Sequence, residues 1–270
     1  MLIGCCTNML PKTESGTGYE YAAAIRKAGF DYIELPAAQV NELSEPAFQE
    51  MLACLEAASL PVYACNNFFP ACLKLVGPDV DAGRVRESFQ GALERAARMR
   101  CRYVVFGSPW SKTCPDGFPA RRAFEQLALW CQEIGREARK KEIIIALEAN
   151  NRQETNMITT FAQAVSLAKA ADHPNVRCLQ DYYHWRVEGD TADSLLACGR
   201  EFLVHSHFAR LEGRGFPAGM EEDRCYHTYF QALKQLDYQG GISLEGFPAS
   251  RESFAAEAAR ACRFLRQAAN

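Results

Sequence analysis

The chain has 270 residues, with 30 lysines and arginines against 33 aspartates and glutamates, so its formal net charge at pH 7 is −3. Hydrophobic residues make up 48% of the chain and charged residues 23%, which excludes a disordered, fibrous or coiled-coil protein. The small net charge argues against nucleic-acid binding, and the longest apolar runs are far shorter than the ~20 residues that span a bilayer. We therefore expect a small molecule as the partner, with no nucleic acid and no membrane.

Short runs of strand-forming residues alternate with longer amphipathic segments, and no linker divides them. We predict strands over residues 2–6, 31–35, 61–65, 102–106, 142–147, 176–180, 202–206 and 242–244. We predict helices over residues 19–28, 46–58, 81–99, 119–140, 157–171, 191–197, 225–236 and 252–267. Eight such units take about 34 residues each, which is typical of an α/β protein with a single (β/α)8 TIM-barrel domain, here residues 1–270.

A doubly wound open sheet is the alternative to the barrel. We disfavour it because no predicted strand is followed by the G-x-G-x-x-G or G-x-x-x-x-G-K-[ST] loop that binds phosphate in nucleotide-binding folds.

The N-terminal segment and the cysteines both favour a cytoplasmic protein. Residues 1–7 show neither the basic region nor the long apolar region of a signal peptide. The 12 cysteines are scattered, form no Cys-x-x-Cys motif, and lie in several cases within apolar runs. Because cytosolic thiols stay reduced and pack as small hydrophobic side chains, we expect free and mostly buried cysteines.

The predicted strands lead to polar residues at the ends where TIM-barrel enzymes hold their chemistry. Buried carboxylates are costly unless they are paired or bound to a cation. Three carboxylates and an imidazole form a site suited to Mn²⁺, Mg²⁺ or Co²⁺, with positions left for a substrate that carries adjacent oxygens. The alternative is that each residue separately caps its strand or pairs with an arginine. The residues, from the last four strands, are Glu148, Asp181, His207 and Glu245.

Further residues near the predicted mouth are candidates for binding the substrate. His184 follows Asp181 by three residues, and we expect it to contact a substrate hydroxyl. Asn66 directly follows the third predicted strand and Trp110 lies in the segment Gly107-Ser-Pro-Trp110 after the fourth, so both are expected to line the substrate pocket.

The sequence leaves alternatives open for two further residues of the predicted strands, His205 and Glu34. His205 and His207 lie two apart and face the same side of their strand, so we expect His207 to be the ligand and His205 a hydrogen-bonded core residue one layer deeper. Glu34 either reaches the floor of the pocket or pairs with Arg102 or a lysine.

Four stretches of the sequence resemble the sugar isomerase/epimerase (xylose isomerase-like) TIM-barrel superfamily. They are Ile145-Ala-Leu-Glu-Ala-Asn-Asn-Arg-Gln-Glu154, Leu179-Gln-Asp-Tyr-Tyr-His184, His205-Ser-His207 and Ser243-Leu-Glu-Gly-Phe247. Within the superfamily the pattern is most similar to the D-tagatose/D-psicose (allulose) 3-epimerase group. The architecture matches over essentially the whole chain, and the specific motifs lie in its second half.

The resemblance implies a metal-dependent carbohydrate isomerase that epimerises C3 of a ketose through a metal-stabilised enediolate. Glu148 and Glu245 would be the acid/base pair, one removing a proton and the other returning it on the opposite face. Glu154 and His184 match positions that contact substrate oxygens. The metal would be Mn²⁺, with Mg²⁺, Co²⁺ or Zn²⁺ as alternatives, bound by Glu148, Asp181, His207 and Glu245.

The segment after His207 departs from the pattern of the group, which runs through Gly-Glu to a substrate-binding arginine. Here it reads Phe208-Ala-Arg-Leu-Glu-Gly-Arg-Gly-Phe-Pro217, so either Arg210 or Arg214 supplies the cation. The changed spacing leaves the hydroxyl pattern of the substrate open. We expect residues 210–224 to form a mobile lid, and the alternative is a solvated loop without a role in binding.

Other reactions of the superfamily remain as alternatives: aldose–ketose, sugar-phosphate or hydroxypyruvate isomerisation, and dehydration. A free sugar is favoured because the segment 245–250 lacks a glycine-rich phosphate cradle. A DNA-repair endonuclease would need a histidine-rich zinc site and a basic groove, which 5 histidines and a charge of −3 disfavour. A non-catalytic barrel subunit is a further alternative. A homo-oligomer, dimer or tetramer, is also expected.

Overall fold

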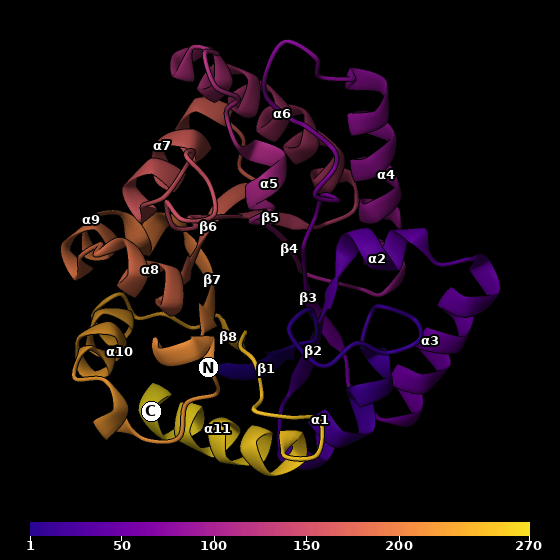
Figure 1. The fold of residues 1–270 in the computed structure, drawn as a ribbon, viewed down its shortest axis with the longest axis vertical. Coiled ribbons are helices and arrows are strands. Elements are labelled where there is room, and N and C mark those ends of the chain that lie inside the picture. Colours follow the sequence, from indigo (N-terminus) through magenta and orange to yellow (C-terminus); the bar gives the residue numbers. More distant parts are fainter.

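Eight parallel strands close into a barrel in the computed structural model, which describes residues 1–270 (Figure 1). Each strand pairs with the next in chain order and β1 also pairs with β8, so the sheet has no free edge. This confirms the predicted TIM barrel and excludes the open sheet. The strands are β1 (Leu2–Cys6), β2 (Tyr32–Pro36), β3 (Val62–Asn66), β4 (Tyr103–Phe106), β5 (Ile144–Glu148), β6 (Val176–Asp181), β7 (Leu203–Phe208) and β8 (Gly241–Leu244).

Amphipathic helices surround the barrel and cover its outer face (Figure 1). In α6, for example, Leu127, Cys131, Ile134 and Ala138 recur at helical spacing and are all buried. No helix is both long and apolar enough to cross a membrane. The longer helices are α1 (Ala22–Ala28), α3 (Glu45–Ala57), α4 (Ala82–Arg98), α6 (Ala120–Lys140), α7 (Phe161–Ala171), α9 (Ala192–Phe202), α10 (Cys225–Gln235) and α11 (Phe254–Ala269).

Two predicted helix boundaries are wrong by several residues. Helix α9 continues past its predicted end at residue 197 as far as Phe202, and its last turn buries Gly199 and Phe202. Helix α7 begins later than residue 157, because Ile158 has a positive φ of 56° and the Thr160 side chain caps the helix by accepting from the backbone N–H of Gln163.

Several short helices at the carboxyl ends of the strands were not predicted. They have only three to seven residues, too few for a helical period to emerge from the sequence. Most of them lie between a strand and the next long helix, where they shape the mouth of the barrel. They are α2 (Ala37–Glu42), α5 (Pro109–Lys112), α8 (Tyr182–Glu188), η2 (Glu212–Arg214) and η3 (Met220–Glu222), whereas η1 (Tyr19–Tyr21) lies within the helix predicted over residues 19–28.

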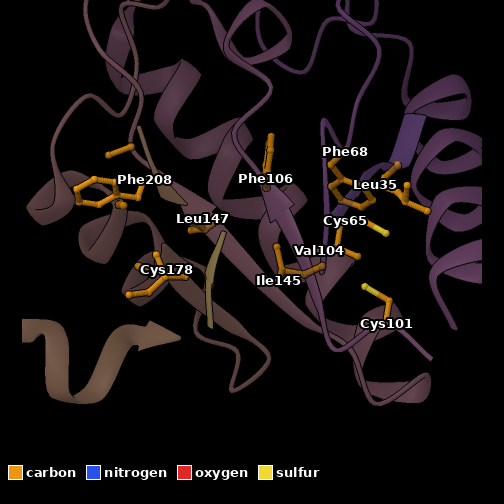
Figure 2. Packing of buried hydrophobic residues seen from close by; sticks show 14 of the residues in the cluster. Leu35, Cys65, Phe68, Cys101, Val104, Phe106, Ile145, Leu147, Cys178 and Phe208 are labelled. Carbon is orange, nitrogen blue, oxygen red and sulfur yellow. The ribbon is translucent and has the colours of Figure 1, made fainter. Parts of the chain in front are cut away.

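The main hydrophobic core lies between the strands and the helices. Figure 2 shows part of it, including Val104, Ile145, Leu147 and Cys178 from β4, β5 and β6. Because side chains alternate along a strand, the neighbours of these residues point into the barrel instead. All twelve cysteines are free thiols, and most of them are buried.

Inside the barrel a small apolar cluster of Val105, Ala146 and Leu179 is separate from the main core. Glu148 lies two residues beyond Ala146 and Asp181 two beyond Leu179, so both carboxylates face the barrel interior one layer closer to the mouth. The strand period thus places the polar residues of the sequence motifs above an apolar floor.

Candidate active site

The four candidate metal ligands converge at the mouth of the barrel. Glu148, Asp181, His207 and Glu245 are all buried, and each offers a ligand atom within 4.8 Å of the others. Nδ1 of His207 lies 3.3 Å from Oε1 of Glu148 and 3.2 Å from Oε2 of Glu245. They meet because parallel neighbouring strands end side by side at one rim of the barrel.

The cluster has the properties expected of a cation site. Nδ1 of His207 and Oε1 of Glu148 are buried without any hydrogen-bond partner, an arrangement that a folded protein rarely leaves unexplained. Burial is the main cause of the raised pKa of Asp181, which is about 7. The Arg214 guanidinium lowers this pKa, whereas the charges of Glu245 and Glu148 raise it further. A bound divalent cation would satisfy both orphan atoms and favour the ionised carboxylates.

Arg214 enters the same cluster from the loop after β7. Its Nη2 donates to Oε2 of Glu245 at 2.6 Å and to Oδ2 of Asp181 at 3.1 Å. The guanidinium also lies 4.7 Å from the centre of the Tyr183 ring. Its backbone has a positive φ of 48° and is held by the N–H of Phe247, which donates to the Arg214 carbonyl at 2.9 Å.

The structure therefore distinguishes the two arginines that the sequence left as alternatives. Arg210 points away from the cluster: its Nε donates to the carbonyl of Glu212, and its Nη1 lies 3.8 Å from a carboxylate oxygen of Glu222. Arg214 lines the cavity and Arg210 does not.

His184 and Glu154, which the resemblance implies contact the substrate, also line the cavity. The side-chain amide nitrogens of Asn150 and Asn151 lie 3.2 Å and 2.8 Å from the two ring nitrogens of His184 and fix the ring. Burial, followed by the charge of Arg214, lowers the pKa of His184 well below its ordinary value, so the ring is neutral. Oε1 of Glu154 lies 3.6 Å from Nη1 of Arg214.

The cavity in front of the cluster has a volume of about 250 Å³ and a mostly polar lining. Trp110 lies at its rim with 58% of its surface exposed. Asn66 lies behind the lining, where it donates to Oε1 of Glu245 at 3.3 Å and to the Asn8 side chain. The uncharged polar residues of the lining are Asn8, Gln39, Asn67, Ser108, Ser111 and Asn150.

Sequence reasoning missed three residues that support the cluster. Asn8, which lies near the opposite end of the chain from Glu245, donates to Oε1 of Glu245 at 2.9 Å. The buried Nζ of Lys112, whose pKa burial lowers to about 8, donates to the Glu148 carbonyl at 2.8 Å. At Gly107 a Cβ would lie 2.0 Å from Oε2 of Glu148, so a larger residue there would displace this carboxylate oxygen. The only signal for Lys112 and Gly107 was their position after the fourth predicted strand.

Glu34 follows neither alternative that the sequence left open. It does not line the cavity and does not pair with Arg102 or a lysine, because its buried carboxylate faces His205 and His207 across the barrel interior, 2.9 Å from each. His205 lies deeper than His207, as expected, and stacks on Tyr103 with 5.6 Å between the ring centres.

Comparisons with known proteins agree with this architecture. A family model described as "Xylose isomerase-like TIM barrel" matches residues 22–268. The D-psicose 3-epimerase of Ruminiclostridium cellulolyticum is 23% identical over 234 residues, which cover 84% of this chain and 77% of that protein. The L-ribulose 3-epimerase of Methylomonas sp. is 34% identical over 117 residues, which cover 43% of this chain and 40% of that protein.

Solved structures give the same result at the level of the fold. The D-allulose 3-epimerase from Methylomonas sp., in complex with D-allulose, has a TM-score of 0.83 at 20% identity, covering 99% of this chain and 96% of that one. The 3-keto-D-glucoside 4-epimerase from E. coli has a TM-score of 0.78 at 22% identity and covers 99% of both chains. At these identities the similarity shows the shared barrel.

Proposed function

The chain belongs to the xylose isomerase-like TIM barrel family, and from this premise we propose that it is a divalent-metal-dependent sugar epimerase that inverts C3 of a ketose. The observation that carries the proposal is the pairing of two buried carboxylates, Glu148 and Glu245, around Nδ1 of His207 beside a cavity of about 250 Å³. The names of the D-psicose and L-ribulose 3-epimerases that match the chain support it. The protein is accordingly an isomerase-class enzyme.

Inversion of a carbon needs one group that removes a proton from one face and a second that returns it to the other. Glu148 ends β5 and Glu245 follows β8, so the two carboxylates reach the cavity from different parts of the rim. Burial would raise the pKa of Glu245, but the charges of His207 and Arg214 outweigh it and lower this pKa to about 2. Glu245 is therefore ionised at neutral pH and able to accept a proton.

The cation would be held by the cluster of Glu148, Asp181, His207 and Glu245. When bound it would polarise the substrate carbonyl and acidify the neighbouring C–H bond. We favour Mn²⁺ over Mg²⁺, Co²⁺ or Zn²⁺ because three of the four donors are carboxylates and the fourth is an imidazole.

The remaining residues bind and orient the sugar. Arg214, His184 and Glu154 lie together on the wall of the cavity. There they would offer donors and acceptors to the substrate oxygens near the reacting carbon. Asn66 orients Glu245, and Trp110 covers the rim.

We assign an unphosphorylated sugar as the substrate. Arg214 is the one cationic side chain of the cavity lining, and its guanidinium already binds the carboxylates of Glu245 and Asp181. The rest of the polar lining consists of carboxylates, the neutral His184, amides and hydroxyls, which suit sugar hydroxyls and leave a phosphate without a counter-charge.

The proposal is tested with Glu245→Gln in the Mn²⁺-loaded enzyme. The amide cannot accept a proton, so the variant should lose epimerisation and the incorporation of solvent deuterium at C3 of a ketohexose or ketopentose. A matched control is Glu222→Gln, because Glu222 lies in the same loop region but outside the cavity. It should exchange at the wild-type rate. Exchange by Glu245→Gln at the wild-type rate would overturn the role of Glu245.

A substrate screen tests the reaction itself. Free ketohexoses, free ketopentoses, their phosphates and hydroxypyruvate are offered with Mn²⁺, and the products are identified by NMR. We expect turnover of a free ketose with inversion at C3. Turnover of hydroxypyruvate or of ketose phosphates alone would overturn the proposal.

A cytoplasmic location and assembly into a dimer or tetramer stay predictions. The twelve free thiols support a reducing compartment. Size-exclusion chromatography with light scattering measures the oligomeric state.

A further inference from the structure

Glu34 lies behind the metal cluster, on the side away from the cavity, and its carboxylate accepts hydrogen bonds from three directions. Nε2 of His207 lies 2.9 Å from its Oε1. Nε2 of His205 lies 2.9 Å from its Oε2, and the hydroxyl of Ser243 donates to the same oxygen at 2.6 Å. Glu34, His205, His207 and Ser243 have no exposed surface at all, so bulk solvent does not reach these contacts.

The groups around Glu34 prevent it from turning away. The hydroxyls of Ser243 and Tyr32 lie 2.8 Å apart, and His205 is stacked between this network and the ring of Tyr103. Cys6 is the only other group near Nε2 of His207, but its sulfur is 4.0 Å away and cannot compete with a carboxylate at 2.9 Å. Nε2 of His207 therefore has one effective partner, and that partner is Glu34.

This contact determines which ring nitrogen of His207 carries the lone pair. To ligate a metal the His207 imidazole must be neutral, with one N–H and one lone pair, and an ionised carboxylate can only accept. The N–H must then sit on Nε2, and the lone pair sits on Nδ1. Nδ1 is the buried ring nitrogen without a hydrogen-bond partner, and it faces Oε1 of Glu148 at 3.3 Å and Oε2 of Glu245 at 3.2 Å.

We propose that Glu34 is a positioning residue that holds His207 with the Nδ1 lone pair aimed at the carboxylates of Glu148 and Glu245, and so sets the affinity of the site for its divalent cation. The inference rests on the metal site of the proposed function. A carboxylate behind a ligating histidine fixes the tautomer and the ring orientation, and it makes the ligand nitrogen more basic. His205 and Ser243 hold the second oxygen of Glu34 and thereby its orientation.

The test measures metal binding and not turnover. Mn²⁺ is titrated into metal-stripped wild type and Glu34→Gln by calorimetry, and the visible absorption of bound Co²⁺ reports the coordination. An amide is uncharged and makes the Nδ1 lone pair less basic. We expect Glu34→Gln to bind Mn²⁺ about 10–100-fold more weakly than wild type and to change the Co²⁺ spectrum.

Tyr229→Phe is the matched control. The Tyr229 hydroxyl lies 2.8 Å from Oγ of Ser206 and donates to the Gln180 carbonyl at 3.0 Å. It therefore contacts the direct chain neighbours of His207 and Asp181 but not those ligands themselves. Its loss removes buried hydrogen bonds to the same two strands, β6 and β7. The Mn²⁺ affinity and the Co²⁺ spectrum should stay as in wild type.

A second measurement does not need a variant that folds. Long-range ¹H–¹⁵N NMR of the Zn²⁺-loaded wild type reports the tautomer of each histidine. His207 should carry its proton on Nε2, and a proton on Nδ1 would overturn the proposal.

The outcomes separate the two proposals. If wild type binds Mn²⁺ and Glu34→Gln binds it equally well, the role of Glu34 is wrong and the proposed function stands. If wild type binds no divalent cation, the metal site of the proposed function fails and the role of Glu34 fails with it.

Discussion

At the scale of single residues, the charge balance of the cavity depends on Arg214. The candidate site holds three buried carboxylates at the rim, and Arg214 donates directly to two of them, Asp181 and Glu245. Only 11% of the arginine side chain is exposed, so solvent screens these contacts weakly. Its loss would leave the carboxylates facing each other and remove the proposed donor for the substrate.

We therefore expect Arg214→Ala to lower kcat/KM for the ketose substrate by about tenfold to a hundredfold, because hydrogen bonds to charged groups contribute roughly 1.5–3 kcal/mol. Arg210→Ala is the matched comparison, since Arg210 pairs with Glu222 outside the cavity. Steady-state kinetics of both variants check the prediction. An Arg210→Ala variant that loses more activity than Arg214→Ala would contradict it.

Residue by residue, the parts of the site that the sequence predicts are those that follow from strand ends and local motifs. Glu148, Asp181, His207 and Glu245 end or follow consecutive strands, so the barrel alone brings them together. The partners of Glu34 and Asn8 are 173 and 237 positions away in the chain, and no local pattern predicts contacts of that kind. The choice between Arg210 and Arg214 depends on the path of one irregular loop.

At the scale of elements, the segment 210–224 is tied down near its end by Asp223. The Tyr182 hydroxyl donates to Oδ2 of Asp223 at 2.7 Å, and Nε of Arg186 donates to the same oxygen at 2.9 Å. Asp223 therefore joins this segment to α8, which contains both residues. The backbone N–H of Cys225, the first residue of α10, donates to Oδ1 at 2.9 Å. One carboxylate thus connects the proposed lid to two helices, and whether the rest of the segment moves stays a prediction.

Replacing this carboxylate should lower stability in a pH-dependent way. Burial tends to raise the pKa of Asp223, but the N–H of Cys225 and the side chains of Tyr182 and Arg186 outweigh it, and the pKa falls below its ordinary 3.8. A lowered pKa stabilises the fold above pH 3.8, and this stabilisation is lost as the pH falls through the folded-state value. We expect Asp223→Asn to cost about 1–3 kcal/mol at pH 7.

Urea unfolding of wild type and Asp223→Asn from pH 7 downwards measures this difference, which should shrink below pH 3.8. Asp116→Asn is the control, because Asp116 is exposed in a turn. A difference that stays constant down to the lowest pH would show that the Asp223 charge does not act in this way.

Among the elements, the long helices and the strands were predictable and the short helices were not. A helix such as α6 shows its buried stripe over 21 residues, whereas α5 has 4 and contains Pro109 at its start. Helix α8 owes its start to the Asp181 side chain, which accepts from the N–H of Tyr183. The same aspartate is a candidate metal ligand, and the sequence motif predicts only that role. The cap that Asp181 provides for α8 was not predicted.

At the scale of the whole molecule, the barrel was the most predictable feature, because it depends on a count of units and not on any one contact.

Removal of the metal should also be visible at this scale. A ligand at a hundred times its Kd stabilises the folded state by about 2.7 kcal/mol. For a domain of this length that is roughly a 5 °C rise in Tm.

Calorimetric scans with Mn²⁺, and again after chelation, measure this shift. Asp181→Asn removes one candidate ligand and should melt at nearly the same temperature with and without Mn²⁺. Equal Tm values for loaded and chelated wild type would contradict the proposed metal site.

The pairing of β1 with β8 has a consequence for how the protein is made. Residues 241–244 of β8 leave the ribosome after the other seven strands, so β1 waits for its second neighbour during nearly all of synthesis. Glu245 follows that strand directly, and its partner Asn8 lies just after β1. Ring closure and completion of the proposed acid/base pair are therefore one event, and a nascent chain that lacks β8 has neither a sealed sheet nor the complete candidate site.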